Sequence, residues 1–207
     1  MILAIIPARS GSKRIKDKNI YELCGKPLID YTVEAALESG VDDVVISSDT
    51  ESYARKNCKF FKRPKELAKD ETPMLPVLLD VVETYELTQK VKVDIVCLLQ
   101  PTSPLRTSDD IINAIYTLME TSASSLYSGY YMGIKTDEPY DKNKPMHFQR
   151  NGAIFLMRKE LLLQGKMWDD DVIKFTMALS RSVDVDTYDD IMMAEALMRY
   201  RLSGGKI

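Results

Sequence analysis

The chain has 207 residues, 45% of them hydrophobic and 29% charged, with a formal net charge of −3 and no long run of one sign. This length and composition suit one globular domain, and the charge argues against a broad surface for nucleic acid. No segment approaches the roughly 18 consecutive apolar residues of a membrane span. The three cysteines stand far apart without a CxxC pair, which indicates neither a disulfide framework nor a zinc site, so we expect a cytoplasmic protein.

The first part of the sequence alternates short apolar runs with amphipathic stretches. Ile2–Ile6 is a continuous apolar run that ends at Pro7, which is typical of a strand buried on both faces. Apolar residues share one face over Pro27–Ser39, which predicts a helix that stops before a glycine. A second buried strand is predicted at Val44–Ile46, and a short helix at Thr50–Asn57.

The middle of the chain continues this alternation. A helical pattern follows Pro73, and Ile95–Leu99 is a third clear strand. The run that begins at Thr107 predicts another helix, because threonine is a favoured N-cap and the apolar residues after it fall on one face. Ser124–Tyr130 is predicted to form a further strand.

The last third contains one irregular region between regular elements. Tyr131–Arg150 lacks clear periodicity and is predicted to be a loop or excursion beside the sheet. Ala153–Met157 returns to a strand, and a final helix is predicted to start near Thr187, with acidic residues at its positive end. Strands alternating with helices predict an α/β fold in a single domain over residues 1–207, with a three-layer, mainly parallel sheet flanked by helices. Ligands in such folds bind beyond the carboxyl ends of the strands.

A cation-rich loop directly follows the first predicted strand. Gly11 and the small serines on either side of it would let backbone N–H groups converge on an anion. A triphosphate needs the kind of neutralisation offered by the five cations in this part of the chain, Arg9, Lys13, Arg14, Lys16 and Lys18. A solvated basic turn is the alternative, but the position after a buried strand favours an anion site. The spacing fits neither a GxxxxGK[ST] loop nor a GxGxxG loop.

Two acidic residues, Asp184 and Asp186, precede the last predicted helix. Alternate residues of an extended segment point to the same side, so the two carboxylates would lie close together. Their repulsion is unfavourable unless a cation separates them, and magnesium prefers carboxylate and phosphate oxygens. The alternative is a solvated acidic turn that caps the helix.

Five segments carry a family resemblance, and they occur in the expected order. They are Ile6–Asn19, Arg63–Asp70, Leu98–Arg106, Asn151–Phe155 and Val183–Thr187. Together they resemble the motifs of the CMP-sialic acid synthetase (acylneuraminate cytidylyltransferase) family, and the third is highly specific. That family commonly has a second glycine where this chain has Ser10. The resemblance implies a Rossmann-like nucleotidyltransferase fold.

The resemblance also implies roles for individual residues. Arg9 and Lys18 would contact the triphosphate of CTP and offset charge on the α-phosphate, while Asp184 and Asp186 would hold Mg²⁺. Asp186, directly or through water on the metal, is our candidate base. Nucleotide contacts are assigned to Ala8, Arg9, Ser12, Lys18, Asn19 and Arg63, with Asn19 reading cytosine. Sugar contacts are assigned to Gln100, Asn151 and Phe155. Without the resemblance, Arg63 would be interpreted as structural and Phe155 as a core aromatic.

The implied reaction joins CMP from CTP to the anomeric hydroxyl of a nine-carbon 2-keto-3-deoxy sugar acid, N-acetylneuraminate or a related sugar, and releases pyrophosphate. The resemblance implies a homodimer that uses the region around 130–150, and Lys135, Lys142 and Lys144 are candidates for a basic sugar contact. One alternative is a cytidylyltransferase for a legionaminic, pseudaminic or Kdo-type sugar. Another is a non-catalytic nucleotide-binding module on the same fold.

Overall fold

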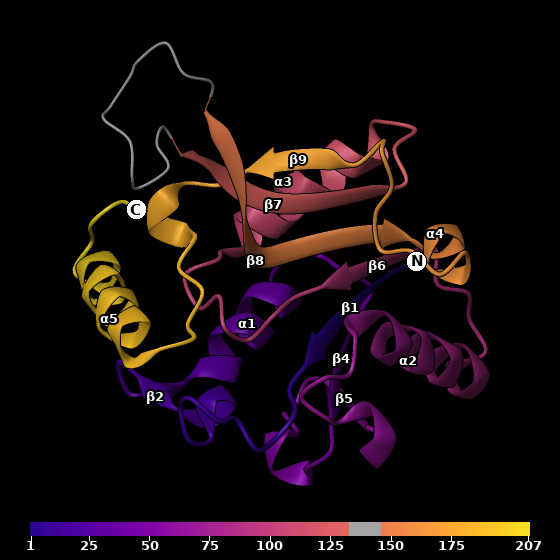
Figure 1. The fold of residues 1–207 in the computed structure, drawn as a ribbon, viewed down its shortest axis with the longest axis horizontal. Helices are drawn as coiled ribbons and strands as arrows, with labels where there is room; N and C mark the ends of the chain where they lie inside the picture. Colours follow the sequence, from indigo (N-terminus) through magenta and orange to yellow (C-terminus); the bar gives the residue numbers. More distant parts are fainter. Residues whose placement is uncertain (133–145) are drawn as a thin grey trace.

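The computed structural model describes residues 1–132 and 146–207 of the chain (Figure 1). Lys135, Lys142 and Lys144 therefore lie outside the described residues. The helices are α1 (Leu28–Leu37), α2 (Met74–Gln89), α3 (Ser108–Met119), α4 (Lys159–Leu163) and α5 (Tyr188–Leu202). Short 3-10 helices occur at Lys18–Ile20, Glu51–Tyr53, Lys65–Leu67 and Leu179–Arg181.

A seven-stranded sheet forms the centre of the fold, in the order β5-β4-β1-β6-β8-β7-β9. All of its neighbouring strands pair in parallel except where β8 lies between β6 and β7. The strands are β1 (Ile2–Pro7), β4 (Asp43–Ser48), β5 (Lys59–Lys62), β6 (Ile95–Leu98), β7 (Ser125–Met132), β8 (His147–Arg158) and β9 (Ile173–Thr176). A separate hairpin pairs β2 (Glu22–Leu23) with β3 (Lys26–Pro27).

Helices cover both faces of this sheet, which confirms the predicted three-layer α/β fold. The apolar side chains of α1 and α3 pack on one face, and those of α2 and α4 pack on the other. The central strands are buried on both sides, since Leu3 and Ile5 belong to one core and Ala4 and Ile6 to the other. A third core joins α5 to Ile15 and to the segment after the last 3-10 helix. In Figure 1, α5 lies on the opposite side of the molecule from α2 and α4.

Two helix starts follow the sequence signals closely. Thr107 caps α3 and Thr187 caps α5, each with an aspartate three residues later that completes a capping box. The short helix predicted at Thr50–Asn57 is only a 3-10 turn over Glu51–Tyr53.

The prediction for Tyr131–Arg150 was wrong at both ends. Tyr131 and Met132 continue β7, and His147–Arg150 begins β8, so the two strands extend past the sheet as an antiparallel pair. The polar, irregular sequence hid this pairing, because most of these residues are exposed and need no alternating pattern. The edge strands β5 and β9 were also missed, since each has four residues and neither is fully buried.

Helices in the described ranges are too short or too polar to cross a lipid bilayer.

Candidate functional site

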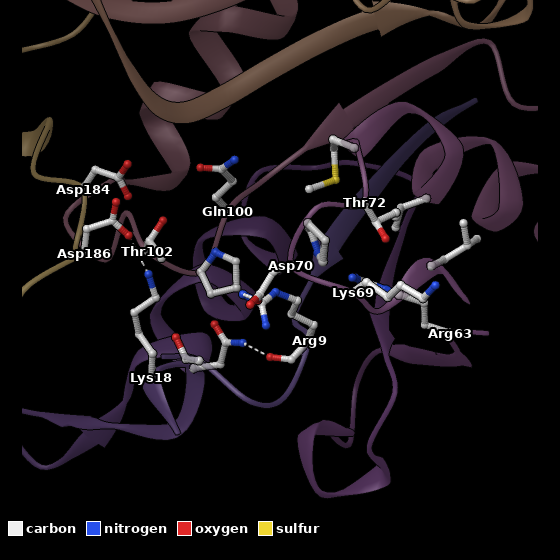
Figure 2. A pocket seen from close by; sticks show the side chains of 17 residues that line it. Arg9, Lys18, Arg63, Lys69, Asp70, Thr72, Gln100, Thr102, Asp184 and Asp186 are labelled. Atoms are coloured by element: carbon white, nitrogen blue, oxygen red, sulfur yellow. Dashed lines mark hydrogen bonds and ion pairs between the residues drawn. The ribbon is translucent and has the colours of Figure 1, made fainter. Parts of the chain in front are cut away.

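A cavity of about 420 Å³ opens where the parallel strands β1 and β6 end. Strand ends, the loop after β1, the segment after β5 and the segment before α5 all contribute side chains to it (Figure 2). Its polar lining consists of Arg9, Ser12, Lys18, Asn19, Arg63, Lys69, Asp70, Thr72, Gln100, Thr102, Asp184 and Asp186. The cavity thus brings most of the predicted nucleotide-binding and metal-binding residues into one place.

The loop after β1 is held by the end of the neighbouring strand β4. The backbone N–H of Ala8 donates to the Ser47 carbonyl at 2.9 Å, and that of Ser10 donates to the Asp49 carboxylate at 2.7 Å. The Ser10 N–H, one of the groups expected to face an anion, therefore has an acceptor just after β4. Ala8 itself is fully buried, so its side chain makes no part of the cavity surface. Cationic side chains, rather than these N–H groups, face the cavity.

Carboxylates already pair with the cations of this loop. Arg9 and Lys13 both form ion pairs with Asp70. Lys18 donates to Asp186 at 2.8 Å and to the Val185 carbonyl at 3.0 Å. Each of these pairs joins parts of the chain that are distant in sequence. An incoming phosphate would compete with the carboxylates for the same cations.

Asn19 and Arg63 line the cavity although both are largely buried. Asn19 is 8% exposed and donates from Nδ2 to the Arg9 carbonyl at 2.9 Å. Arg63 is 5% exposed and donates to the Ser47 hydroxyl and carbonyl at 3.1 and 2.8 Å. Burial lowers the pKa of Arg63 to about 10, which still leaves it charged near neutral pH. In Figure 2, Arg63 and Lys69 lie at the end of the cavity away from Asp184 and Asp186.

Asp184 and Asp186 lie side by side at the other end of the cavity (Figure 2). Asp184 is open to the cavity but is otherwise surrounded by protein. This burial, together with the charge of Asp186, raises the pKa of Asp184, although a hydrogen bond from Thr102 acts in the opposite direction. A divalent cation would relieve both effects, and paired carboxylates are the donors that Mg²⁺ prefers. The residues present therefore fit a magnesium site. No group of three or more His, Cys, Asp or Glu side chains in the described ranges has metal-binding geometry, so substrate or water oxygens would have to complete the coordination.

Gln100 faces Asp184 across the backbone of Gly152. A Cβ placed on Gly152 would lie 2.8 Å from Gln100 Oε1 and 3.5 Å from Asp184 Oδ2, and the residue has a φ of +72°. The positive φ therefore favours glycine there, and a Cβ would also push the Gln100 amide aside. The buried guanidinium of Arg106 supports this arrangement by donating to the carbonyls of Gln100 and Ala153 at 3.3 and 2.7 Å.

Asn151 lies beside a second cavity rather than in the one described above. It is 3% exposed, and its amide oxygen accepts from the Ser128 hydroxyl and the Ala153 N–H. Its amide nitrogen donates to the Ser182 hydroxyl at 2.9 Å and contacts Met177. The side chain is thus committed to links between β7, β8 and the turn before Val183.

Phe155 also points away from the cavity residues. It stacks on Trp168 with ring centroids 6.4 Å apart and packs against the core beneath α2 and α4. Arg150 lies over the Trp168 ring at 4.8 Å, so the aromatic pair continues to a charged side chain at the surface. Phe155 is not part of the cavity surface described above.

Comparisons with known proteins agree with this geometry. A sequence model described as cytidylyltransferase matches residues 3–200. The chain belongs to the cytidylyltransferase family. It is 34% identical to an N-acylneuraminate cytidylyltransferase of Streptococcus agalactiae over 92% of this chain and 51% of that protein. It is 30% identical to a CMP-N,N'-diacetyllegionaminic acid synthase of Legionella pneumophila over 95% of this chain and 96% of that protein.

The predicted resemblance to the CMP-sialic acid synthetase family is therefore confirmed. The chain spans about half the length of the first of these relatives. A solved CMP:2-keto-3-deoxy-manno-octonic acid synthetase complexed with CTP shares the fold, with a TM-score of 0.72 and 19% sequence identity. The match covers 97% of this chain and 99% of that one.

Within this cytidylyltransferase fold, several polar residues of the site region were not singled out from the sequence. Asp49 holds the loop after β1, Asp70 pairs with its cations, and Thr102 contacts Asp184. The position after the second predicted strand pointed to the neighbourhood of Asp49, because strand ends of a parallel sheet share one edge. Asp70 ends one of the family-like segments, but its partners lie more than fifty positions earlier.

Proposed function

We propose that the chain transfers CMP from CTP to the anomeric hydroxyl of a nine-carbon 2-keto-3-deoxy sugar acid, N-acetylneuraminate or a related sugar, with release of pyrophosphate. The observation that carries this proposal is the meeting, in one cavity of a cytidylyltransferase-family fold, of the cations after β1 with the carboxylates before α5. Either group alone would suit many anions or cations. Together they suit a nucleoside triphosphate bound with a divalent metal.

In the proposed reaction, the chain mainly positions charge. Arg9 and Lys18 would contact the phosphates of CTP and stabilise the charge that develops on the α-phosphoryl oxygens. The buried Arg63, already fixed by two hydrogen bonds to Ser47, would hold the nucleotide at the far end of the cavity. Asn19, whose Nδ2 is engaged by the Arg9 carbonyl, retains its amide oxygen as an acceptor for the cytosine amino group. Ser12 lies on the same wall.

Asp184 and Asp186 would hold Mg²⁺, which would neutralise phosphate charge when bound. The oxygen of the C2 hydroxyl attacks the α-phosphorus as the bond to the β-phosphate oxygen breaks, and pyrophosphate leaves. We assign Asp186 as the acceptor of the hydroxyl proton. Its position in the cavity beside Asp184 supports that assignment, because the sugar hydroxyl and the phosphates would meet at that end.

The sugar would lie at the Gln100 and Asp184 end of the cavity, where an amide and a carboxylate meet over Gly152. Asn151 would act on the sugar through its links to the turn before Val183, and Phe155 through its stack on Trp168. The alternative substrate is a legionaminic, pseudaminic or Kdo-type sugar. A legionaminic acid synthase and a pseudaminic acid cytidylyltransferase each match this chain over nearly its full length, which supports the first two.

We also propose a homodimer. A second cavity of about 910 Å³ adjoins the first at Asp184 and is lined by apolar and polar side chains of β7, β8, the 3-10 helix before Val183, and α5, with Asn151 among them. Met132, Leu179 and Met193 are between 38% and 65% exposed there, which is unusual for side chains of this kind gathered in one place. Light scattering of the purified protein tests this, and Met193→Glu should shift the mass toward that of a monomer.

A pyrophosphate-release assay with CTP, Mg²⁺ and a panel of 2-keto sugar acids tests the function. We expect release with one or more nine-carbon sugars and strong loss of turnover in Asp186→Asn with little change in folding. Asp189→Asn, an exposed acidic residue at the start of α5 outside the cavity, is the matched control. CTP binding without release for any sugar would favour a non-catalytic module, and near-normal kinetics in Asp186→Asn would remove that residue from the reaction.

A further inference from the structure

Asp49 binds the loop after β1 through both of its carboxylate oxygens. Oδ1 accepts the backbone N–H of Ser10 at 2.7 Å, and Oδ2 accepts the Ser10 hydroxyl at 2.5 Å. Asp49 directly follows the end of β4, the strand that pairs with β1. The contact therefore crosses between two neighbouring strand ends. A two-point contact of this kind fixes both the position and the orientation of the residue it holds.

The bond to Ser10 is one of three successive anchors in the loop. The Ala8 N–H is held by the Ser47 carbonyl, the Arg9 carbonyl accepts from Asn19, and Ser10 is held by Asp49. The backbone on both sides of Arg9 is thus fixed, and the Arg9 side chain remains to line the cavity. Gly11 follows with a φ of +69°, which turns the chain away immediately after the last anchor.

Asp49 is also suited to hold this position without reaching the substrate. It is half-buried and is not among the residues that line the cavity. Burial alone would raise its pKa, but the hydrogen bonds from Ser10 outweigh burial and lower it. The carboxylate therefore stays ionised, and its hydrogen bonds with the loop are charge-assisted.

We propose that Asp49 is a positioning residue that directs the Arg9 guanidinium at the nucleotide phosphates through Ser10. The inference rests on the proposed function. It also gives a role to the departure from the family pattern at Ser10, because a glycine there could offer the N–H but not the hydroxyl. The hydrogen bond from the Ser10 hydroxyl thus adds a second contact between Asp49 and the loop.

A double-mutant cycle between Asp49 and Arg9 tests this proposal. Asp49→Ala should lower kcat/KM for CTP by roughly 10- to 100-fold, because a displaced charge loses much of its effect on the transition state. In an Arg9→Ala background the same change should have little further effect, since the residue being positioned is already absent. Dissociation constants for CTP, measured by calorimetry for all four proteins, give a readout that does not depend on transfer.

Three further variants separate positioning from a general structural role. Asp49→Asn should recover much of the activity, because its amide can accept from the Ser10 N–H and donate to the hydroxyl. Ser10→Gly and Ser10→Ala keep the N–H bond and should lose only a few-fold. Thr50→Ala, whose hydroxyl contacts Ser52, is the neighbouring control. Melting temperatures report on folding in every case.

The outcomes distinguish the two levels of the proposal. Equal losses from Asp49→Ala with and without Arg9, or an Asp49→Asn variant as impaired as Asp49→Ala, would overturn the positioning role. A parent protein that neither binds nor turns over CTP would overturn the proposed function, and this inference with it. Non-additive losses together with recovery in Asp49→Asn are the expected result.

Discussion

The loop after β1 and the strand β8 both contain residues that resemble family motifs, but only the loop residues have side chains that line the cavity. In the loop, Arg9, Ser12, Lys18 and Asn19 all line the cavity. In β8, Asn151 is buried in a hydrogen-bond network and Phe155 stacks on Trp168. The loop presents several side chains to one ligand, whereas the strand divides its side chains between opposite faces.

The difference follows from local geometry. A loop at a strand end can direct side chains to one side because its backbone is not bound to a regular ladder. A strand alternates faces, and a bulge changes the alternation. The register between β7 and β8 shifts near Gly129, so residues around Asn151 do not follow a simple period of two. Motif residues on a strand can therefore act by holding the site together rather than by contacting the ligand.

The loop side of this comparison should give the largest effect. Lys18→Ala removes a cation that lines the cavity and pairs with Asp186, and we expect kcat to fall by about 100- to 1,000-fold. Steady-state pyrophosphate release measures this. Lys16→Ala changes an exposed neighbour that does not line the cavity, and it should stay within a few-fold of the parent. Comparable losses in both variants would mean that the loop acts only through its general charge.

The strand side should respond in stability first. Asn151→Ala leaves the hydroxyls of Ser128 and Ser182 without this partner in a buried region, at a cost of about 2–3 kcal/mol in the free energy of unfolding. Denaturant unfolding measures the change, with Gln149→Ala, an exposed residue of the same strand, as the control. A fully stable Asn151→Ala protein with a raised KM for the sugar would instead make Asn151 a direct contact.

The end of the cavity with Asp184 and Asp186 should show a smaller effect on stability, one that depends on pH. Folding raises the pKa of Asp184, so its protonated form stabilises the folded state. This stabilisation is lost as the pH rises from the ordinary pKa of an aspartate through the raised pKa of the folded protein. At neutral pH the ionised side chain therefore destabilises the metal-free protein. Asp184→Asn should raise the melting temperature by at most about a few degrees without Mg²⁺.

Added Mg²⁺ should raise the melting temperature of the parent protein and do so much less in Asp184→Asn. Thermal scans at several Mg²⁺ concentrations, with and without CTP, measure both effects. Equal stabilisation of parent and variant by Mg²⁺ would place the metal elsewhere.

The smallest expected effect concerns Asp70. Its ion pairs with Arg9 and Lys13 lie at the protein surface, where solvent screens such pairs and they contribute little. Asp70→Asn should therefore strengthen CTP binding by at most about five-fold, because the phosphates no longer displace a carboxylate. Calorimetry at low and moderate salt measures this, and the gain should shrink as salt rises. Weaker binding in the variant would show that Asp70 contributes to the bound state.

Much of the fold could be predicted because its signals are local. The apolar runs of β1, β4 and β6 and the threonine caps of α3 and α5 require no knowledge of distant residues. The four-residue edge strands β5 and β9 could not be predicted, because their pairing partners rather than their own composition define them. The part of β7 and β8 that extends past the sheet could not be predicted for the same reason.

For the site, the sequence alone shows which residue types are available: a cluster of cations after the first buried strand and two alternating carboxylates before the last helix. Which of these residues meet depends on the tertiary structure. Lys18 reaches Asp186, Arg9 reaches Asp70, and Asp49 holds Ser10 because strand ends distant in sequence share one edge of a parallel sheet. It also decided that Asn151 is enclosed, because the face and register of β8 depend on its pairing with β6 and β7.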